Sequence, residues 1–257
     1  MRLSYDSGIV VESESSDCRL ILDPSRKQRS AENVLVGVSH AHSDHLKKHD
    51  APVIATHGTC DLAGYGHLNA KKYSQKHDFD GMSVTQLNAN HILGSSQFLI
   101  ESKDGERIVY TGDVRKQSSQ LFGTCEIPEC GTLVVESTYG LPQFKFPSAG
   151  EVQAELDKWL REKAHLHRNV VLGAYSLGKS QEVIAMLNEI GITPVVHPRI
   201  AKFTDVYNEH GFSLNYLRAG TPEADEVSRS QFTAVMPHNL IDRPLLQSIT
   251  HQNGRPA

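Results

Sequence analysis

The amino-acid sequence predicts an α/β protein made of two regions that differ in character. Up to about residue 145, short β-branched or apolar runs alternate with polar turns, as in consecutive strands. From residue 146 onward, amphipathic helical segments alternate with apolar strands, and this order predicts a parallel sheet covered by helices. We therefore expect one domain over residues 1–145 and a second over residues 146–257.

The first region is predicted to consist mainly of strands. The turn Lys103-Asp104-Gly105 joins two apolar runs, which predicts a β-hairpin. Helices are expected here only after His45 and after Thr59. The runs that fit strands are 8–13, 18–23, 34–39, 82–89, 96–102, 107–113 and 132–138.

The second region shows the periodicity of amphipathic helices. A helix is expected over 151–163, because four apolar residues recur there on one helical face. They are Val152, Leu156, Trp159 and Leu160. After it, a strand, a helix, a strand and a helix closed by Gly211 are expected over 169–175, 181–190, 192–197 and 203–211.

The composition is that of an ordinary globular protein, with 39% hydrophobic and 22% charged residues. No apolar run reaches about 18 residues and no signal-peptide core precedes the first strand, so we expect a cytoplasmic protein without membrane contact. The net charge of −4 creates no overall attraction for a polyanion, although a local basic groove is compatible with it. The four cysteines are too scattered for a disulfide scaffold, and Cys125 and Cys130 are interpreted as free thiols rather than a structural zinc site.

Histidine is abundant, with 14 residues in 257, and its clustering indicates a metal site. The segment His40-Ala41-His42-Ser43-Asp44-His45 directly follows a predicted strand. Because residues i and i+2 of a strand point the same way, His40 and His42 can share one ion, and Asp44 and His45 can face a second where the chain turns. Imidazole and carboxylate are ligands that suit zinc.

Two further segments supply the remaining ligands that such a site needs. One predicted strand ends at Asn90-His91 and is followed by Gly94; another ends at Thr111-Gly112-Asp113. A glycine beside each candidate ligand allows the backbone to approach closely. Either segment alone is weak, because an isolated histidine is more often structural and an aspartate after glycine usually makes a turn.

These segments together resemble the metallo-β-lactamase superfamily, whose histidine–x–histidine–x–aspartate–histidine motif matches residues 40–45. The resemblance implies an αββα sandwich and two zinc ions, with His91 and Asp113 completing the ligands and Asp113 bridging. One zinc would bind His40, His42 and His91, and the other would bind Asp44, His45 and Asp113. Asp23, at the end of an early strand, would support the ligands from behind.

Other segments resemble the β-CASP nucleases within this superfamily, namely 90–101, 110–115 and 134–140. The resemblance implies hydrolysis of nucleic-acid phosphodiesters by water that two zinc ions activate. Asp44 would hold metal and accept a proton, and Glu136 would orient a catalytic histidine. A surface acid at a strand end is the alternative interpretation of Glu136.

The segment 173–182 is similar to the ligase-associated DNA enzymes of that group. A strand, a glycine-containing turn and a helix start make an anion site in which Gly178, Lys179 and Ser180 would anchor a phosphate; a simple turn is the alternative. His197 would face the substrate groove, or would be structural. By this similarity we expect a DNA exonuclease with a DNA ligase or repair proteins as partners.

In the family, the chain returns to the first domain after the β-CASP region and supplies a late zinc ligand and a general acid. The sequence stops at Ala257 before such a segment, and neither His238 nor His251 lies in a matching motif. We therefore expect an incomplete sandwich, a partial β-CASP domain and a weakened second zinc position. An RNA-processing nuclease, a silent nucleic-acid-binding relative and a non-nuclease hydrolase such as a thioesterase remain alternatives.

Overall fold

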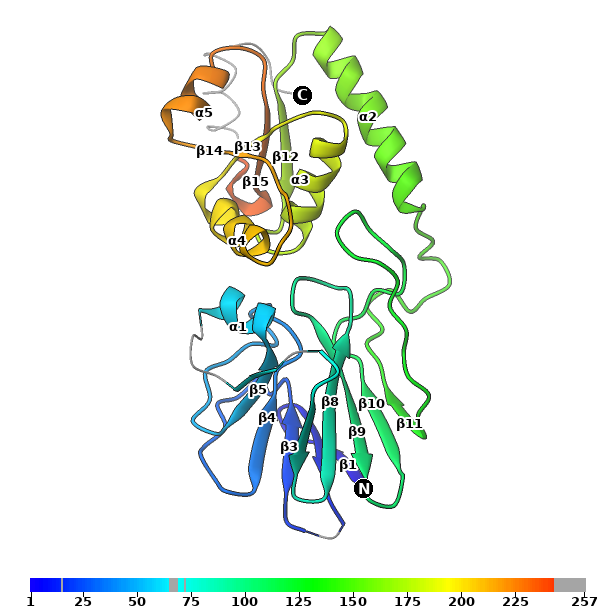
Figure 1. Cartoon of the computed structure of the whole chain (residues 1–257). Coiled ribbons are helices and arrows are strands. Elements are labelled where there is room, and N and C mark those ends of the chain that lie inside the picture. Colours follow the sequence, from blue (N-terminus) through cyan, green and yellow to red (C-terminus); the bar gives the residue numbers. More distant parts are fainter. Residues whose placement is uncertain (15, 65–68, 72, 243–257) are drawn as a thin grey trace. The chain divides into compact units, whose positions relative to one another are not determined.

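The computed structural model describes residues 1–14, 16–64, 69–71 and 73–242, so His251 lies outside the described residues. The chain forms two compact units (Figure 1). The first contains Met1–Ser118 and Gly123–Phe144, and the second contains Ser119–Phe122 and Lys145–Ala257. Each unit is described by itself.

The first sheet of unit 1 begins with an antiparallel meander and continues as a parallel sheet. Its strands pair in sequence order, antiparallel from β1 to β3 and parallel from β3 to β6. Helix α1 (His57–Ala63) follows β5, because Thr56 accepts a hydrogen bond from Thr59 N and caps the helix start. The strands are β1 (Arg2–Tyr5), β2 (Ile9–Glu12), β3 (Arg19–Leu22), β4 (Val34–Gly37), β5 (Val53–Thr56) and β6 (Asn69–Lys71).

The second sheet of unit 1 has the order β11-β10-β9-β8-β7. β9 and β10 pair antiparallel with Arg107 opposite Glu101, which confirms the predicted hairpin. β8 is also antiparallel to β9, so β8 and β10 run in the same direction. The strands are β7 (Lys76–Phe79), β8 (Met82–Asn88), β9 (Ser96–Ser102), β10 (Arg107–Tyr110) and β11 (Thr132–Val134).

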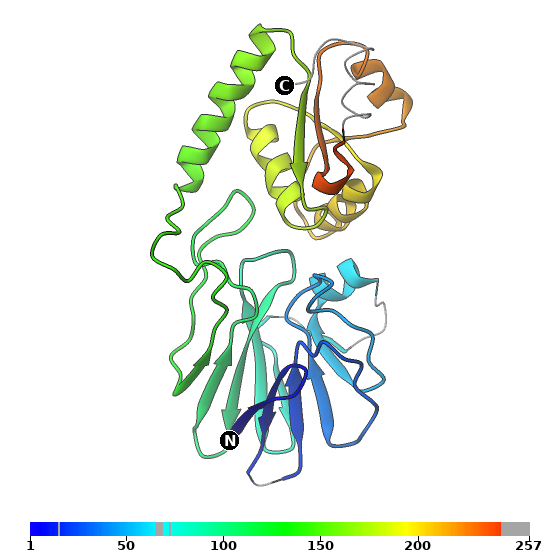
Figure 2. The ribbon, with the colours of Figure 1, turned by 180° about the vertical axis from the view of Figure 1, so that it is seen from behind.

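The two sheets of unit 1 form two layers (Figure 2), and buried side chains from both layers make up a hydrophobic cluster between them. Leu20, Leu22 and Leu35 of the first sheet pack with Phe98 and Ile100 of the second. The absence of a side chain at Gly37 permits this packing, since a Cβ there would lie 2.9 Å from the Phe98 ring. The sandwich predicted for the first region is therefore present.

Unit 2 contains a four-stranded parallel sheet in the order β12-β15-β13-β14. The parallel α/β arrangement predicted from the alternation of strands and helices is confirmed. Helices α3 and α4 both pack on β15. The elements are α2 (Ala149–His165), β12 (Val170–Ala174), α3 (Lys179–Glu189), β13 (Val195–Val196), α4 (Pro198–Glu209), β14 (Leu217–Arg218), α5 (Pro222–Val227), β15 (Thr233–Pro237) and η1 (His238–Leu240).

Two of the predicted helices differ from the structure. The helix expected after His45 is absent: a turn over residues 43–45 is closed by Leu46 N donating to His42 O, and the chain then continues as a loop in which Asp50 N donates to Gln28 O. The helix expected over 203–211 begins five residues earlier, at Pro198. Proline fits the first helical position, where its missing N–H is not needed.

Candidate metal centre

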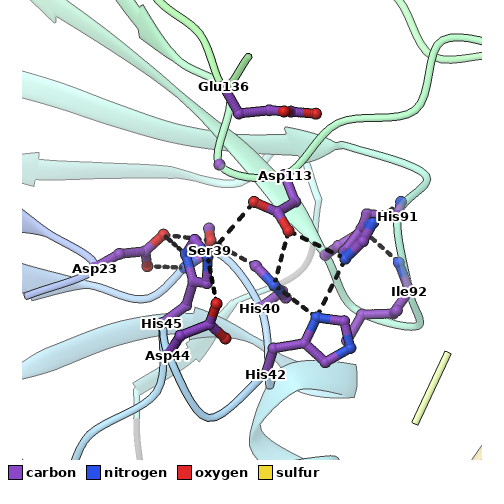
Figure 3. A network of polar contacts seen from close by, with 12 residues as sticks. Asp23, Ser39, His40, His42, Asp44, His45, His91, Ile92, Asp113 and Glu136 are labelled. Atoms are coloured by element: carbon purple, nitrogen blue, oxygen red, sulfur yellow. Dashed lines mark hydrogen bonds and ion pairs between the residues drawn. The ribbon is translucent and has the colours of Figure 1, made fainter. Parts of the chain in front are cut away.

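Four loops of unit 1 bring the predicted metal ligands together at one end of the sandwich (Figure 3). The residues from Ser39 to His45 follow β4, and Asp23 directly follows β3. His91 follows β8, and Asp113 follows β10. Because the preceding strands β3 and β4 are parallel, as are β8 and β10, the loops that follow them lie at corresponding ends of their sheets.

The first group of ligand atoms belongs to His40, His42, His91 and Asp113. His42 Nδ1 lies 3.1 Å from His40 Nε2 and 3.2 Å from His91 Nε2. Asp113 Oδ2 lies 3.4 Å from His91 Nε2 and 3.7 Å from His40 Nε2. Three ring nitrogens and one carboxylate oxygen therefore point at a common centre.

These spacings fit a tetrahedral zinc ion. Bonds of about 2.0–2.1 Å at tetrahedral angles place ligand atoms about 3.3 Å apart, and the four measured distances lie on either side of that value. His42 Nδ1 faces two other ring nitrogens and, in a neutral ring, can form a linear N–H···N bond with one of them, whereas a shared cation can bind the lone pairs of all three. The residues present therefore fit a metal ion.

The second group consists of Asp44, His45 and Asp113. His45 Nε2 lies 3.5 Å from Asp113 Oδ1 and 3.7 Å from Asp44 Oδ2. Asp113 thus directs one oxygen to each group, which is the arrangement of a bridging carboxylate. The Asp44 side chain is 78% exposed and lies at the open side of the cluster.

Asp23 holds the ligands from behind through several hydrogen bonds. Its Oδ1 accepts from Ser39 N at 2.7 Å, and its Oδ2 accepts from His45 Nδ1 and from the Tyr110 hydroxyl, each at 2.8 Å. Its backbone φ of 45° is left-handed and unusual for a residue other than glycine. Asp23, His40 and His45 form another set of side chains close enough to hold a metal ion. The Asp23 carboxylate, however, already accepts the hydrogen bonds from Ser39, His45 and Tyr110.

Ser39 and Tyr110 were not identified as site residues from the sequence. Ser39 directly precedes His40, and Tyr110 lies three residues before Asp113, so each adjoins a motif that was recognised. Neither side chain is a metal ligand, and their common partner Asp23 is distant in sequence from both. Only the fold reveals that the three residues meet.

The environment changes the pKa values of the cluster in different directions. Burial, followed by the charges of His45, His42 and His91, lowers the pKa of His40 far below its ordinary value. Burial raises the pKa of Asp113, and Glu136 adds to this rise while His45 opposes it. His40 is therefore neutral at physiological pH, which is the state that binds a metal ion.

His45 shows the opposite shift. Burial by itself lowers its pKa, but the hydrogen bond and the charge of Asp23, with Asp113 and Asp44 adding, raise it above the ordinary value. The protonated ring is therefore more favoured here than in an ordinary histidine, and a metal ion at Nε2 would compete with a proton for that nitrogen.

Glu136 lies beyond the end of β11, on the Asp113 side of the cluster (Figure 3). Its Oε2 accepts a hydrogen bond from Thr138 N at 2.8 Å. The carboxylate is near enough to raise the pKa of Asp113. Its expected role of orienting a catalytic histidine stays a prediction.

In unit 2, the predicted phosphate-binding turn is largely occupied by its own hydrogen bonds. Gly178 N donates to Gln181 Oε1 at 2.7 Å, and the buried Ser180 hydroxyl donates to Tyr175 O at 2.6 Å. Lys179 pairs with Glu182 at 3.1 Å, yet its side chain is 60% exposed. Of the three predicted residues, Lys179 alone presents a largely exposed side chain.

His197 is the N-cap of α4. Its Nδ1 accepts a hydrogen bond from Arg199 N at 3.1 Å, so in the neutral ring the proton lies on Nε2. Burial and the charge of Arg199 lower its pKa. The hydrogen bond from Arg199 N therefore supports the structural interpretation of His197.

Comparisons with known proteins identify relatives of this chain. No protein-family model matches the sequence. The chain is 33% identical over 184 residues to a probable DNA ligase of Opitutus terrae, which covers 69% of this chain and 18% of that protein. It is 28% identical over 220 residues to an RNase J-like protein of Methanocaldococcus jannaschii, covering 69% of this chain and 51% of that protein.

Two further similarities are to another curated relative and to a solved structure. Subunit 3 of the cleavage and polyadenylation specificity factor of Dictyostelium discoideum is 33% identical over 133 residues, 49% of this chain and 16% of that protein. A solved structure, a protein of unknown function from Enterococcus faecalis V583, superposes with a TM-score of 0.62 over 92% of this chain and 75% of its own. Its 14% identity supports the fold alone.

The chain is a homologue of the metallo-β-lactamase and β-CASP proteins. It spans about half or less of the length of the curated relatives just named. The resemblance and the α/β fold class inferred from the sequence are therefore confirmed. Among the described residues, no helix has both the length and the apolar composition to cross a lipid bilayer.

Proposed function

We propose that this chain is a zinc-dependent nuclease that hydrolyses phosphodiester bonds of nucleic acid. The observation that carries the proposal is Asp113: its Oδ2 faces the group of three imidazoles, 3.4 Å from His91 Nε2 and 3.7 Å from His40 Nε2, and its Oδ1 lies 3.5 Å from the single imidazole of His45. A bridging carboxylate between two histidine groups is the donor set of a two-metal hydrolytic site. Among metals, zinc prefers this mixture of imidazole and carboxylate.

His40, His42 and His91 would hold one zinc ion, His45 and Asp44 would hold the other, and Asp113 would bind both. Zinc at these positions supplies Lewis acidity, lowering the pKa of water to near neutrality and neutralising charge on phosphate oxygens. The chain's own contribution is to keep the buried His40 neutral and to hold Asp44 at the open side of the site. In this proposal Asp44 would also accept a proton from the attacking water.

DNA is the proposed substrate and exonucleolytic removal the proposed mode, supported by the similarity to a protein named as a probable DNA ligase. RNA is the second candidate, favoured by the relatives named as an RNase J-like protein and as RNase aCSPSF2. Under the first alternative, a DNA ligase or repair protein is the proposed partner. The cytoplasm is the proposed location.

The assignment of substrate-binding roles within unit 2 belongs to the same proposal. The exposed Lys179 ammonium would contact a phosphate, and Gly178 and Ser180 would shape the turn that presents it. His197 would offer its Nε2–H to the substrate while its Nδ1 caps α4. Residues 1–145 are proposed as the metallo-β-lactamase domain and residues 146–257 as a partial β-CASP domain.

The test is digestion of end-labelled single-stranded DNA and RNA of matched sequence, with added zinc and with a chelator. We expect chelator-sensitive cleavage, with DNA cut faster than RNA and products accumulating from one end. Preference for RNA would select the second candidate. Absence of cleavage in folded, zinc-loaded protein would reject the nuclease, and a parallel thioester assay would then examine the alternative hydrolase.

Substitution of single ligands ties cleavage to the site. His42→Ala and Asp44→Ala are each expected to abolish cleavage while the circular-dichroism spectrum stays that of the folded protein. Undiminished cleavage by either variant would disprove the assignment of that residue.

A further inference from the structure

Ser39 is a buried residue between β4 and the first histidine of the cluster, and its side chain joins Asp23 to His40. Its hydroxyl donates to Asp23 Oδ2, and the same oxygen lies 2.9 Å from His40 Nδ1. Its backbone N–H donates to the other oxygen of Asp23 at 2.7 Å. Ser39 is 1% exposed, so no bulk water competes for these contacts.

The direction of the hydrogen bonds follows from counting protons. A carboxylate accepts and cannot donate, and a serine hydroxyl has one proton. The Ser39 proton is therefore directed to Asp23, and the Ser39 oxygen can only accept from His40 Nδ1–H. A neutral imidazole carries one ring proton, so His40 Nε2 has a lone pair, and this nitrogen faces His42 Nδ1 at 3.1 Å and Asp113 Oδ2 at 3.7 Å.

The Asp23 carboxylate also orients His45, by a direct hydrogen bond. His45 Nδ1 donates to Asp23 Oδ2 at 2.8 Å, which leaves the lone pair of Nε2 toward Asp113 Oδ1 at 3.5 Å. One aspartate thus acts on both groups of ligands, directly on His45 and through a hydroxyl on His40.

The position of Ser39 is also fixed by the loop that carries Asp113. A Cβ added to Gly112 would lie 2.6 Å from Ser39 Cβ and 2.7 Å from Ser39 Oγ. Any side chain at residue 112 would therefore displace the hydroxyl. The glycine before Asp113 allows this approach to Ser39 while placing the carboxylate beside the histidines.

We infer that Ser39 is a positioning residue, whose hydroxyl fixes the proton of His40 on Nδ1 and thereby directs the Nε2 lone pair to the first metal position. This inference rests on the proposed metal site. Groups behind a metal-bound histidine typically change metal affinity about 10–100-fold when they are removed. Loss of the Ser39 hydroxyl acts on one of the two metal positions, because His45 reaches Asp23 by its own contact.

The test compares Ser39→Ala with a matched control, Ser96→Ala. Ser96 is also fully buried, but its hydroxyl donates to Ser39 O at 3.2 Å and accepts from Gln86 Nε2 at 2.8 Å, so its contacts are with amide groups. Long-range ¹H–¹⁵N spectra of the metal-free and zinc-loaded proteins identify which ring nitrogen of each histidine carries the proton. Zinc affinity is measured by competition with a chromophoric chelator.

In the wild-type protein and in Ser96→Ala, His40 is expected to carry its proton on Nδ1 with and without zinc, and His45 is expected to carry a proton on Nδ1 alone once zinc is bound. In Ser39→Ala, His40 is expected to lose this single tautomer while His45 keeps it, and affinity for one zinc ion is expected to fall about 10–100-fold. Retention of the Nδ1–H tautomer of His40 in folded Ser39→Ala, with zinc affinity within twofold of wild type, would overturn the inference. An equal change in Ser96→Ala would also overturn it.

The readout separates this inference from the proposed nuclease. The tautomer of His40 is measured in the metal-free protein and does not depend on cleavage of any substrate. A wild-type protein with the predicted tautomers and no nuclease activity would reject the proposed nuclease function and support the positioning role of Ser39. Normal cleavage by Ser39→Ala, together with an unchanged tautomer of His40, would support the nuclease function and reject the role of Ser39.

Discussion

Unit 1 and unit 2 each place a polar segment directly after a strand, and the two segments use their polar atoms differently. After β4, His40 Nε2 lies 3.1 Å from His42 Nδ1 and 3.7 Å from Asp113 Oδ2, which follows β10, while the Nδ1 atoms of His40 and His45 contact Ser39 and Asp23. After β12, Gly178 N and the Ser180 hydroxyl donate to neighbouring protein oxygens. A metal site needs donor atoms that converge on a common point; the segment after β4 contributes such atoms, whereas the segment after β12 directs its polar atoms to neighbouring protein groups.

The largest effect that would test this contrast comes from Asp113, which faces both groups of histidines. Asp113→Asn keeps the shape but replaces one oxygen by an N–H donor, which repels a cation. We expect bound zinc, measured by mass spectrometry of the purified protein, to fall from two ions to less than one, and cleavage to be lost. Asp104→Asn, in an exposed hairpin turn, is the control; two bound zinc ions in Asp113→Asn would refute the bridging role.

The next effect concerns Asp23, which contacts His45 directly and reaches His40 through the Ser39 hydroxyl. Asp23→Asn cannot accept at both side-chain atoms, so His45 and the Ser39 hydroxyl lose part of their support. We expect zinc affinity to fall about 10–100-fold at both positions, whereas Ser39→Ala affects one. A chelator-competition titration measures both steps, and a loss confined to one position would contradict the role given to Asp23.

Ser180 tests the statement that the turn after β12 uses its polar atoms for contacts within the protein. Because its buried hydroxyl donates to Tyr175 O, Ser180→Ala is expected to reduce the free energy of unfolding by about 0.5–1.5 kcal/mol. Urea unfolding followed by the fluorescence of Trp159, the single tryptophan of the chain, reports on unit 2. In contrast, Lys179→Ala is expected to weaken substrate binding without this loss of stability, and the reverse pattern would restore Ser180 as a substrate-binding residue.

The smallest effect is the pH dependence of His197. Its pKa is lowered in the folded protein, so below the ordinary value near 6.5 the unfolded state takes up a proton that the folded state resists. The stabilisation by this cap is therefore present above pH 6.5 and is lost as the pH falls through the lowered pKa. His197→Asn keeps an N-cap residue that does not titrate. Its unfolding, followed by Trp159 fluorescence, should vary less with pH than that of wild type between pH 7 and 5; identical profiles would exclude the effect.

The sequence predicted some elements well because their signals are local. The hairpin of β9 and β10 and the parallel strands of unit 2 follow from turn residues and from alternation of elements. The helix expected after His45 is wrong because Asp50 pairs with the distant Gln28, a contact that no local pattern contains. The start of α4 was placed too late because the capping role of His197 was not recognised.

By itself the sequence indicated the family, and the resemblance to that family predicted the ligand types and their grouping into residues 40–45, His91 and Asp113. The tertiary structure decided how their atoms are used. It directs the two oxygens of Asp113 to different groups and brings Ser39 and Tyr110 to Asp23. In unit 2 it pairs Gly178 N and the Ser180 hydroxyl with other protein groups. The physical reason is that hydrogen-bond partners are chosen by proximity in space, and strand ends distant in sequence meet only when the sheets have formed.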